Sequence, residues 1–160
     1  MRELILVRHA KSDWSDPELS DHDRPLNARG RRAAPLMATR FAASEQQVQR
    51  VLSSTAVRAR ATAEEFASAL GMQVELEPAL YLASASTLLA TAAASEVDSV
   101  LLVAHDPGIT ELASYLSDGG ISHMPTCAVA RFVWQVETWG NAIEQAADSW
   151  SFETPRDYAE

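Results

Sequence analysis

The 160-residue chain has one cysteine, Cys127, and no apolar run near the length of a membrane span. A single thiol cannot form an internal disulfide, so we expect a reducing, cytoplasmic location and interpret Cys127 as a small buried apolar residue. A transmembrane helix needs about 20 apolar residues. The first apolar run, residues 4–7, is short and follows acidic Glu3. It is therefore neither a signal peptide nor a membrane anchor.

Basic residues are also scarce, with 13 Lys and Arg against 22 Asp and Glu, for a net charge of −9 at pH 7. Nucleic acids and anionic membranes are bound through basic surfaces, so neither is an expected partner. A local arginine cluster would still accommodate an anionic substrate. The hydrophobic content of 47% is typical of a globular protein. The length fits a single domain, residues 1–160.

Short apolar segments alternate with helical ones along the chain. Strands are predicted at residues 3–7, 50–53, 73–76, 99–104 and 128–136. The first and fourth are apolar enough to be central in a sheet, whereas alternation in the last predicts an edge strand. The tail from residue 138 is expected to pack onto the domain through Trp139, Trp150 and Phe152.

Helices are predicted at residues 27–43, 55–70, 86–95 and 107–116. Pro35 predicts either a bend in the first helix or a later start. Gly71 is a natural stop for the second helix. Strands that alternate with helices predict an α/β fold, here a three-layer α/β/α sandwich around a mainly parallel sheet. The polar segment 13–27 is long for a connecting loop, and loops of that length are often functional.

Polar chemistry follows three of the predicted strands. Arg8-His9 comes after the first, a segment with Arg58 follows the second, and His105 follows the fourth. The carboxyl ends of parallel strands meet at one sheet edge, where ligands bind. Arginines clamp anions, helix N-termini favour them, and a neutral imidazole can attack phosphorus. The sequence therefore predicts a phosphate pocket that contains a histidine nucleophile.

The charges around His9 suit this chemistry. Arg8 and Arg58 disfavour the imidazolium form, so we expect them to keep His9 neutral near pH 7. One ring nitrogen would attack, while the other would donate to a backbone carbonyl that fixes the tautomer. The same arginines would neutralise charge on the transferring phosphoryl group, and His105 would donate to one of its oxygens.

These segments resemble the signature of a known superfamily. Its parts are Arg8-His9-Ala10, the run STAVRARAT at residues 54–62, and VAHDPG at residues 103–108. Together they resemble the histidine phosphatase, or phosphoglycerate mutase-like, superfamily. The run LVRHAKSDW at residues 6–14, with DRPLN at residues 23–27, is similar to the SixA-type phosphohistidine phosphatases.

The resemblance implies a phosphoglycerate mutase-like fold and a role for each motif residue. His9 would be the phosphorylated nucleophile, while Arg8, Arg58 and His105 would bind the phosphoryl group. The family uses no metal, so no cofactor is expected. One departure is Ala10, where the wider superfamily usually has glycine and SixA-like members often have alanine.

A second departure concerns the proton donor. Mutases and many phosphomonoesterases carry a glutamate after the third strand, but residues 78–84 contain no carboxylate. The short connection 80–88 also leaves no room for a helical lid. An alkoxide leaving group needs a proton, whereas a phosphohistidine N–P bond needs less help. Both features favour a phosphoprotein substrate, although Asp106 and Glu111 remain candidate donors.

Other residues near the expected pocket have competing interpretations. Lys11 and Arg24 would either contact substrate or be solvated at the surface. Helical periodicity places Arg58 and Arg60 at about equal angles from the core centre, so the resemblance alone selects Arg58, and Arg60 is expected to pair with Glu64 at i+4. A zinc site from His9, His105 and nearby acids is conceivable, but no paired ligand spacing supports one.

The sequence thus predicts a metal-independent phosphatase that works through a phosphohistidine enzyme intermediate. Its expected substrate is phosphohistidine on a signalling or phosphotransfer protein. One alternative is a phosphatase of small phosphate esters on the same fold. An alternative of a different class is a non-catalytic module that binds a phosphorylated partner.

Overall fold

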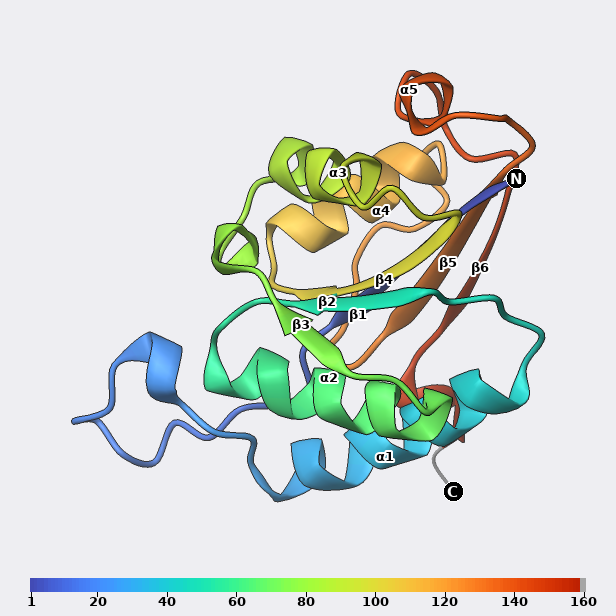
Figure 1. Ribbon diagram of the computed structural model, residues 1–160. Helices are drawn as coiled ribbons and strands as arrows, with labels where there is room; N and C mark the ends of the chain where they lie inside the picture. Colours follow the sequence, from blue (N-terminus) through green and yellow to red (C-terminus); the bar gives the residue numbers. More distant parts are fainter. Residues whose placement is uncertain (159–160) are drawn as a thin grey trace.

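The computed structural model describes residues 1–158 and has a six-stranded mixed sheet in the order β3-β2-β4-β1-β5-β6 (Figure 1). The strands are β1 Arg2–Arg8, β2 Arg50–Ser53, β3 Val74–Leu76, β4 Ser99–Ala104, β5 Val129–Trp134 and β6 Ser149–Glu153. Strands β1 to β4 pair in parallel, and β5 runs antiparallel to both β1 and β6. The prediction of a mainly parallel sheet with β1 and β4 at its centre is confirmed.

Helices cover both faces of the sheet. The α-helices are α1 Ala28–Ala43, α2 Val57–Leu70, α3 Ala85–Ala93, α4 Gly108–Leu116 and α5 Trp139–Ala142, with short 3-10 turns η1 Asp21–Asp23, η2 Pro78–Leu80 and η3 Pro155–Tyr158. Helices α1 and α2 pack on one face, and α3 and α4 pack on the other (Figure 1). This is the predicted α/β/α sandwich. No helix among residues 1–158 is long and apolar enough to cross a membrane.

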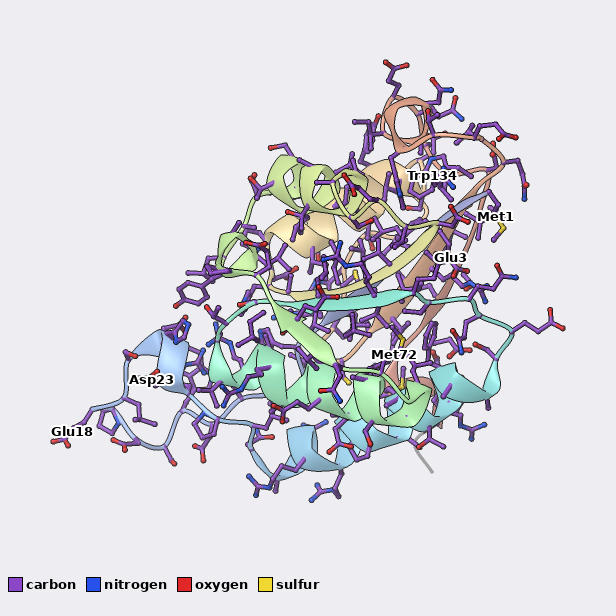
Figure 2. All side chains as sticks on the ribbon, viewed as in Figure 1. Met1, Glu3, Glu18, Asp23, Met72 and Trp134 are labelled. Atoms are coloured by element: carbon purple, nitrogen blue, oxygen red, sulfur yellow. The ribbon has the colours of Figure 1, made fainter. Side chains whose placement is uncertain are left out.

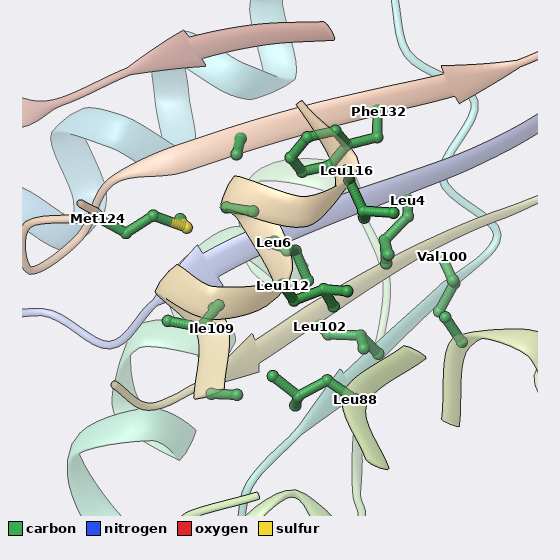
Figure 3. Close-up of a cluster of buried hydrophobic side chains, with 14 of the residues drawn as sticks. Leu4, Leu6, Leu88, Val100, Leu102, Ile109, Leu112, Leu116, Met124 and Phe132 are labelled. Atoms are coloured by element: carbon green, nitrogen blue, oxygen red, sulfur yellow. The ribbon is translucent and has the colours of Figure 1, made fainter. Parts of the chain in front are cut away.

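Strand β1 shows why a continuous apolar run forms a central strand. Leu4 and Leu6 point into the core under α3 and α4 (Figure 3). Ile5 and Val7 belong to the core on the opposite face, under α1 and α2. All four side chains are fully buried. Each contributes about 1.5–3 kcal/mol of hydrophobic stabilisation. The strand that carries Arg8 at its end is thus fixed by packing on both faces.

The helix boundaries follow local capping chemistry. The side chain of Asn27 accepts a hydrogen bond from the Gly30 N–H at 2.9 Å and caps α1. Helix α1 therefore begins at Ala28, and the alternative of a later start at Pro35 is wrong, because one missing N–H inside the helix does not move a capped end. Gly71, at φ 70°, ends α2 as predicted.

The C-terminal tail differs most from expectation. Strand β5 was expected at an edge, but it lies between β1 and β6, a strand that the sequence pattern did not reveal. Cross-strand pairs join Phe132 to Trp150 and Ala130 to Phe152. Trp139 is buried in the core, so the tail packs onto the domain as predicted. Strand β6 escaped prediction because its two apolar residues, Trp150 and Phe152, were interpreted only as side chains that pack the tail onto the domain.

Segment 13–27 leaves the body of the domain between β1 and α1. Figure 2 shows Glu18 at its far tip and Asp23 nearer the sheet edge, on the η1 turn. The segment returns at Leu26, which is buried and forms an isolated bridge to Ser12. Segment 13–27 therefore lies at the edge of the sheet at which β1 ends.

Candidate active site

The three predicted polar segments converge at one edge of the sheet. Arg8 at the end of β1 pairs with Ala104 at the end of β4, and Ser53 at the end of β2 pairs with Val103. A cavity of about 310 Å³ opens there. It is lined by Arg8, His9, Lys11, Ser12, Trp14, Arg24, Arg58, His105, Asp106 and Thr126. All six residues selected from the sequence therefore lie around one cavity.

His9 is held in a single orientation. Its Nδ1 lies 2.8 Å from the Ala10 carbonyl oxygen, to which it donates, so Nε2 carries the lone pair. That Nε2 accepts from Arg58 Nε at 3.4 Å. The main chain is also fixed, because the His9 N–H donates to Ala104 O at 3.1 Å and the Cys127 N–H donates to His9 O at 3.1 Å. The expected backbone contact of the ring is confirmed.

Both histidines in the cavity are neutral. Burial, helped by the charges of Arg58, Arg8 and Arg24, lowers the pKa of His9 to about 4 against the opposing effect of the hydrogen bond to Ala10 O. Burial likewise lowers the pKa of His105 to about 3, with help from His9 and Arg58. The sequence argument attributed the neutral ring to the arginines alone. Removal from water is the larger cause, because the strand end that carries His9 lies under other side chains.

Arg58 is the most constrained cation of the site. It is buried, and its Nη1 donates to the Asp21 carbonyl at 2.6 Å while Nη2 donates to the Asp21 carboxylate at 3.0 Å. The same Nη2 lies 3.4 Å from His105 Nδ1. Arg60, the competing arginine, points away and pairs with Glu64 at 3.6 Å as predicted.

Asp21 is a site residue that sequence reasoning missed. Its carboxylate also accepts from Arg24 Nη2 at 2.9 Å and from the Tyr81 hydroxyl at 2.6 Å. One carboxylate thus joins the segment 13–27 to α2 and to the segment after η2. Nothing in the local pattern marks it, because only the fold of that loop brings it to Arg58.

His105 contacts a serine on the neighbouring strand end. Its Nε2 lies 2.7 Å from the Ser54 hydroxyl, which itself accepts from the Ala56 N–H at 3.2 Å. Arg58 Nη2 can only donate, so its approach to Nδ1 at 3.4 Å makes Nδ1 the acceptor and places the ring proton on Nε2, which donates to Ser54 Oγ. Thr62 plays a similar linking part, since its hydroxyl accepts from the Ala10 N–H and donates to Arg58 O.

The remaining cations differ in how firmly they are held. Arg8 donates to Met124 O at 2.9 Å and lies 3.6 Å from Asp106. Arg24 is buried, donates to Ser12 Oγ at 2.6 Å, and lies 3.3 Å from the centre of the Trp14 ring. It belongs to the cavity wall and not to the solvated surface. Lys11 is exposed at the rim.

The two candidate acids separate clearly. Glu111 is exposed on α4 and does not line the cavity, whereas Asp106 lines it and contacts Arg8 and the Thr110 hydroxyl. Between residues 1 and 158, no group of three or more His, Cys, Asp or Glu side chains is arranged to hold a metal ion. The zinc set of His9, His105 and acids considered from the sequence is thus not assembled in this part of the chain.

Comparison with known proteins places this geometry in a family. The model of the histidine phosphatase superfamily (branch 1) matches residues 4–81. The chain belongs to the histidine phosphatase superfamily. The chain is 32% identical over 149 residues to an uncharacterized protein of Mycobacterium leprae, covering 90% of this chain and 89% of that one.

Solved structures extend the likeness to nearly the whole chain. A protein of Agrobacterium tumefaciens named as a phosphohistidine phosphatase SixA matches with a TM-score of 0.80 and 29% identity, covering 96% of this chain and 98% of that one. The protein histidine phosphatase SixA in complex with tungstate shares the fold, with a TM-score of 0.77, 24% identity and coverages of 98% and 99%. The phosphoglycerate mutase-like fold is therefore confirmed, and the likeness supports a phosphatase or mutase activity.

Proposed function

We propose that this histidine phosphatase is a single catalytic domain that removes the phosphoryl group from phosphohistidine on a signalling or phosphotransfer protein. The reaction runs without a metal, through a phosphohistidine formed on His9. One observation carries the proposal above all. A neutral His9 imidazole is fixed through Nδ1 by a main-chain carbonyl, and its Nε2 lone pair faces a cavity lined by three buried or half-buried arginines.

The reaction has two displacements at phosphorus. In the first, the Nε2 lone pair of His9 forms the new N–P bond, and the substrate N–P bond breaks with its electron pair going to the leaving imidazole, which takes a proton. In the second, water attacks phosphorus, the His9 N–P bond breaks, and inorganic phosphate leaves with the ring restored. Each displacement spreads charge over the three equatorial oxygens, which the cations stabilise.

Different residues around the cavity bind different parts of the substrate. Arg8, Arg24 and Arg58 bind the phosphoryl oxygens, because their guanidinium groups surround the cavity. Once the phosphoryl group is bound, its negative charge favours a proton on His105 Nδ1, from which the ring donates to a further oxygen. Lys11, at the exposed rim, contacts the part of the substrate that lies outside the cavity.

The substrate class follows from leaving-group chemistry. Residues 78–84 supply only the Tyr81 hydroxyl to the site, and that hydroxyl donates to Asp21. An imidazole leaves from phosphorus with less need for a proton than an alkoxide does. The segment between η2 and α3 is short, so the cavity lies open to a bulky protein partner.

The test is phosphate release from a phosphohistidine-labelled phosphotransfer domain with a metal chelator present. We expect release by the wild-type protein and none by the His9→Ala variant. Acid-labile, base-stable radiolabel should appear on wild-type protein quenched during turnover. Release that persists in folded His9→Ala would overturn the nucleophile, and release abolished by chelator alone would overturn the metal-free chemistry.

A small phosphate ester is the second candidate substrate, and the position of Asp106 in the cavity wall favours it. Asp106 would then donate the proton that the leaving alkoxide of the substrate needs. The Asp106→Asn variant distinguishes the two candidates. Loss of phosphoserine hydrolysis, with phosphohistidine never hydrolysed by the wild type, would establish the ester. A module that only binds phosphate would leave His9 unlabelled with every substrate.

A further inference from the structure

A second cavity adjoins the one that holds His9. Its volume is about 380 Å³, and the two cavities share Lys11 and Thr126 in their walls. The lining residues are Lys11, Arg29, Ala33, His123, Pro125, Thr126, Thr154, Pro155 and Arg156. The proposed chemistry at His9 uses none of these residues apart from Lys11.

The antiparallel end of the sheet builds this second cavity. Val129 at the start of β5 pairs with Val7 near the end of β1, and Glu153 at the end of β6 pairs with Val129. Residues 123–126, which precede β5, and residues 154–156, which follow β6, therefore reach the same sheet edge as His9. The first turns of α1 add Arg29 and complete the wall. The C-terminal tail thus brings Arg156 next to the active site.

The charge of this cavity is opposite to that of the whole protein. Lys11, Arg29 and Arg156 line it with His123, and no Asp or Glu does, although the chain carries a net charge of −9. Within residues 1–158, none of the three side chains forms an ion pair. Like charges held together repel one another, and no contact of folding offsets this repulsion here.

Two carboxylates near the cavity have partners other than Arg29 and Arg156. Asp106, in the wall of the neighbouring cavity, faces Arg8 at 3.6 Å and His123 at 3.9 Å. Asp157 accepts a hydrogen bond from the Thr154 N–H at 2.7 Å. Among residues 1–158, the positive charge of Arg29 and Arg156 therefore has no carboxylate that neutralises it in an ion pair.

We propose that this cavity, lined by Arg29, Arg156 and Lys11, is a subsite for acidic side chains that flank the phosphohistidine of a substrate protein. The proposal rests on the proposed function and adds a sequence preference to it. Arginine binds a carboxylate by two parallel hydrogen bonds, and exposed complementary charges raise the rate of encounter. The subsite adjoins the phosphoryl cavity, so a polypeptide held at His9 extends directly across it.

The test compares two phosphohistidine peptides of equal length, one with glutamates and one with glutamines beside the phosphohistidine. We expect wild-type kcat/KM to favour the glutamate peptide by about five- to tenfold, mainly through KM, as two partly exposed ion pairs would give. The preference should disappear in the Arg29→Gln/Arg156→Gln variant and shrink with added salt. Hydrolysis of phosphoramidate, which fills only the phosphoryl cavity, should be unchanged.

The matched control is Arg32→Gln/Arg60→Gln, which removes the same amount of charge from exposed positions outside both cavities. It should keep the wild-type preference. Equal rates on both peptides, or a preference that survives in the Arg29/Arg156 variant, would overturn the subsite and leave the proposed function standing. Failure to hydrolyse either peptide would overturn both. A preference for phosphoglycolate over both peptides, lost in the same variant, would assign the cavity to a small dianion and overturn the peptide.

Discussion

Asp21 accepts hydrogen bonds from both terminal nitrogens of Arg58. The Asp21 carbonyl oxygen lies 2.6 Å from Nη1 of Arg58, and its carboxylate lies 3.0 Å from Nη2. With both outer nitrogens held, Arg58 Nε is directed at His9 Nε2, 3.4 Å away. Asp21 therefore acts as a positioning residue, because it sets the plane of a guanidinium that lies against the proposed nucleophile.

The Asp21→Asn variant tests this relationship. Partial burial raises the pKa of Asp21, but hydrogen bonds from Tyr81, Arg24 and Arg58 outweigh it and hold that pKa well below its usual range. The carboxylate is thus ionised at every working pH, and its loss should lower kcat on phosphoramidate about tenfold, or ~1.4 kcal/mol. Asp23→Asn, on the same turn, is the control. An unchanged kcat in folded Asp21→Asn would contradict the positioning role.

Arg58→Ala should raise the barrier to phosphoryl transfer by about 2–4 kcal/mol, comparable to the loss of an oxyanion donor. The neighbouring Arg60→Ala is a matched control, because Arg60 is half exposed and pairs only with Glu64. Steady-state rates on phosphoramidate measure both effects. Similar losses in the two variants would show that charge on α2, and not contact with the phosphoryl group, is what matters.

The low pKa of His9 predicts an unusual pH profile. Because burial and the nearby arginines lower that pKa to about 4, the ring stays unprotonated well below the ordinary histidine value of 6.5. The single-turnover rate of His9 phosphorylation should therefore stay level from pH 8 to about pH 5. A fall centred near pH 6.5 would show that the free protein protonates His9 as an ordinary exposed histidine.

The lowered pKa values of His9 and His105 should also make the free energy of unfolding depend on pH. Between pH 6.5 and about 4 the unfolded chain protonates both His9 and His105, whereas the native protein protonates neither until its lowered pKa is reached. The unfolded state then binds more protons, so the free energy of unfolding falls as the pH drops through this window. Urea unfolding at several pH values measures the loss. It should be smaller in His105→Asn, which removes one of the two titrating groups.

Ser54→Ala should lower kcat about tenfold with a small change in KM. Without the hydroxyl at 2.7 Å, His105 Nε2 loses its acceptor, so the ring is no longer held in the orientation in which it faces the phosphoryl oxygen. Nitrogen-15 shifts of the imidazole report the tautomer independently of activity. Ser54→Thr, which keeps the hydroxyl, should restore the wild-type tautomer if the side chain fits.

Gly30→Ala should destabilise the protein by roughly 1–3 kcal/mol, because an added Cβ would lie 2.2 Å from the Lys11 carbonyl oxygen and force backbone to move. Since Lys11 follows the nucleophile loop, the rate should fall as well. Gly140→Ala is the control, since its Cβ would meet only the Thr138 hydroxyl at 3.8 Å. Equal thermal midpoints for the two variants would show that the backbone at Lys11 moves aside at no cost in stability.

Much of the catalytic set was visible in the sequence because its signals are local. Apolar runs marked β1 and β4, and the residues that end them, Arg8-His9 and His105, had to meet once the strands were parallel. Arg58 was selected over Arg60 by resemblance, since helical periodicity placed both at equal angles from the core. The helix stop at Gly71 was equally local.

The features that the sequence did not predict depend on contacts between residues far apart in the chain. Asp21 reaches Arg58 and Tyr81 only because the segment 13–27 folds back over the sheet edge. The position of β5 inside the sheet required β6, in which polar residues alternate with Trp150 and Phe152 over only five positions. Likewise, Arg24 had an undecided place until its contacts with Ser12 and Asp21 put it in the cavity wall.

The sequence by itself determined the α/β frame, the strand ends and the cations and histidines placed on them, because hydrophobic period and capping act between near neighbours. Only the tertiary structure decided the protonation of His9, since burial is a property of the whole fold. The tertiary structure also brings Asp21 into hydrogen-bonding contact with Arg58, and it places Arg29 and Arg156 in the wall of one cavity beside the active site. These pairs are far apart in the chain, and no local pattern encodes the distance that the fold closes between them.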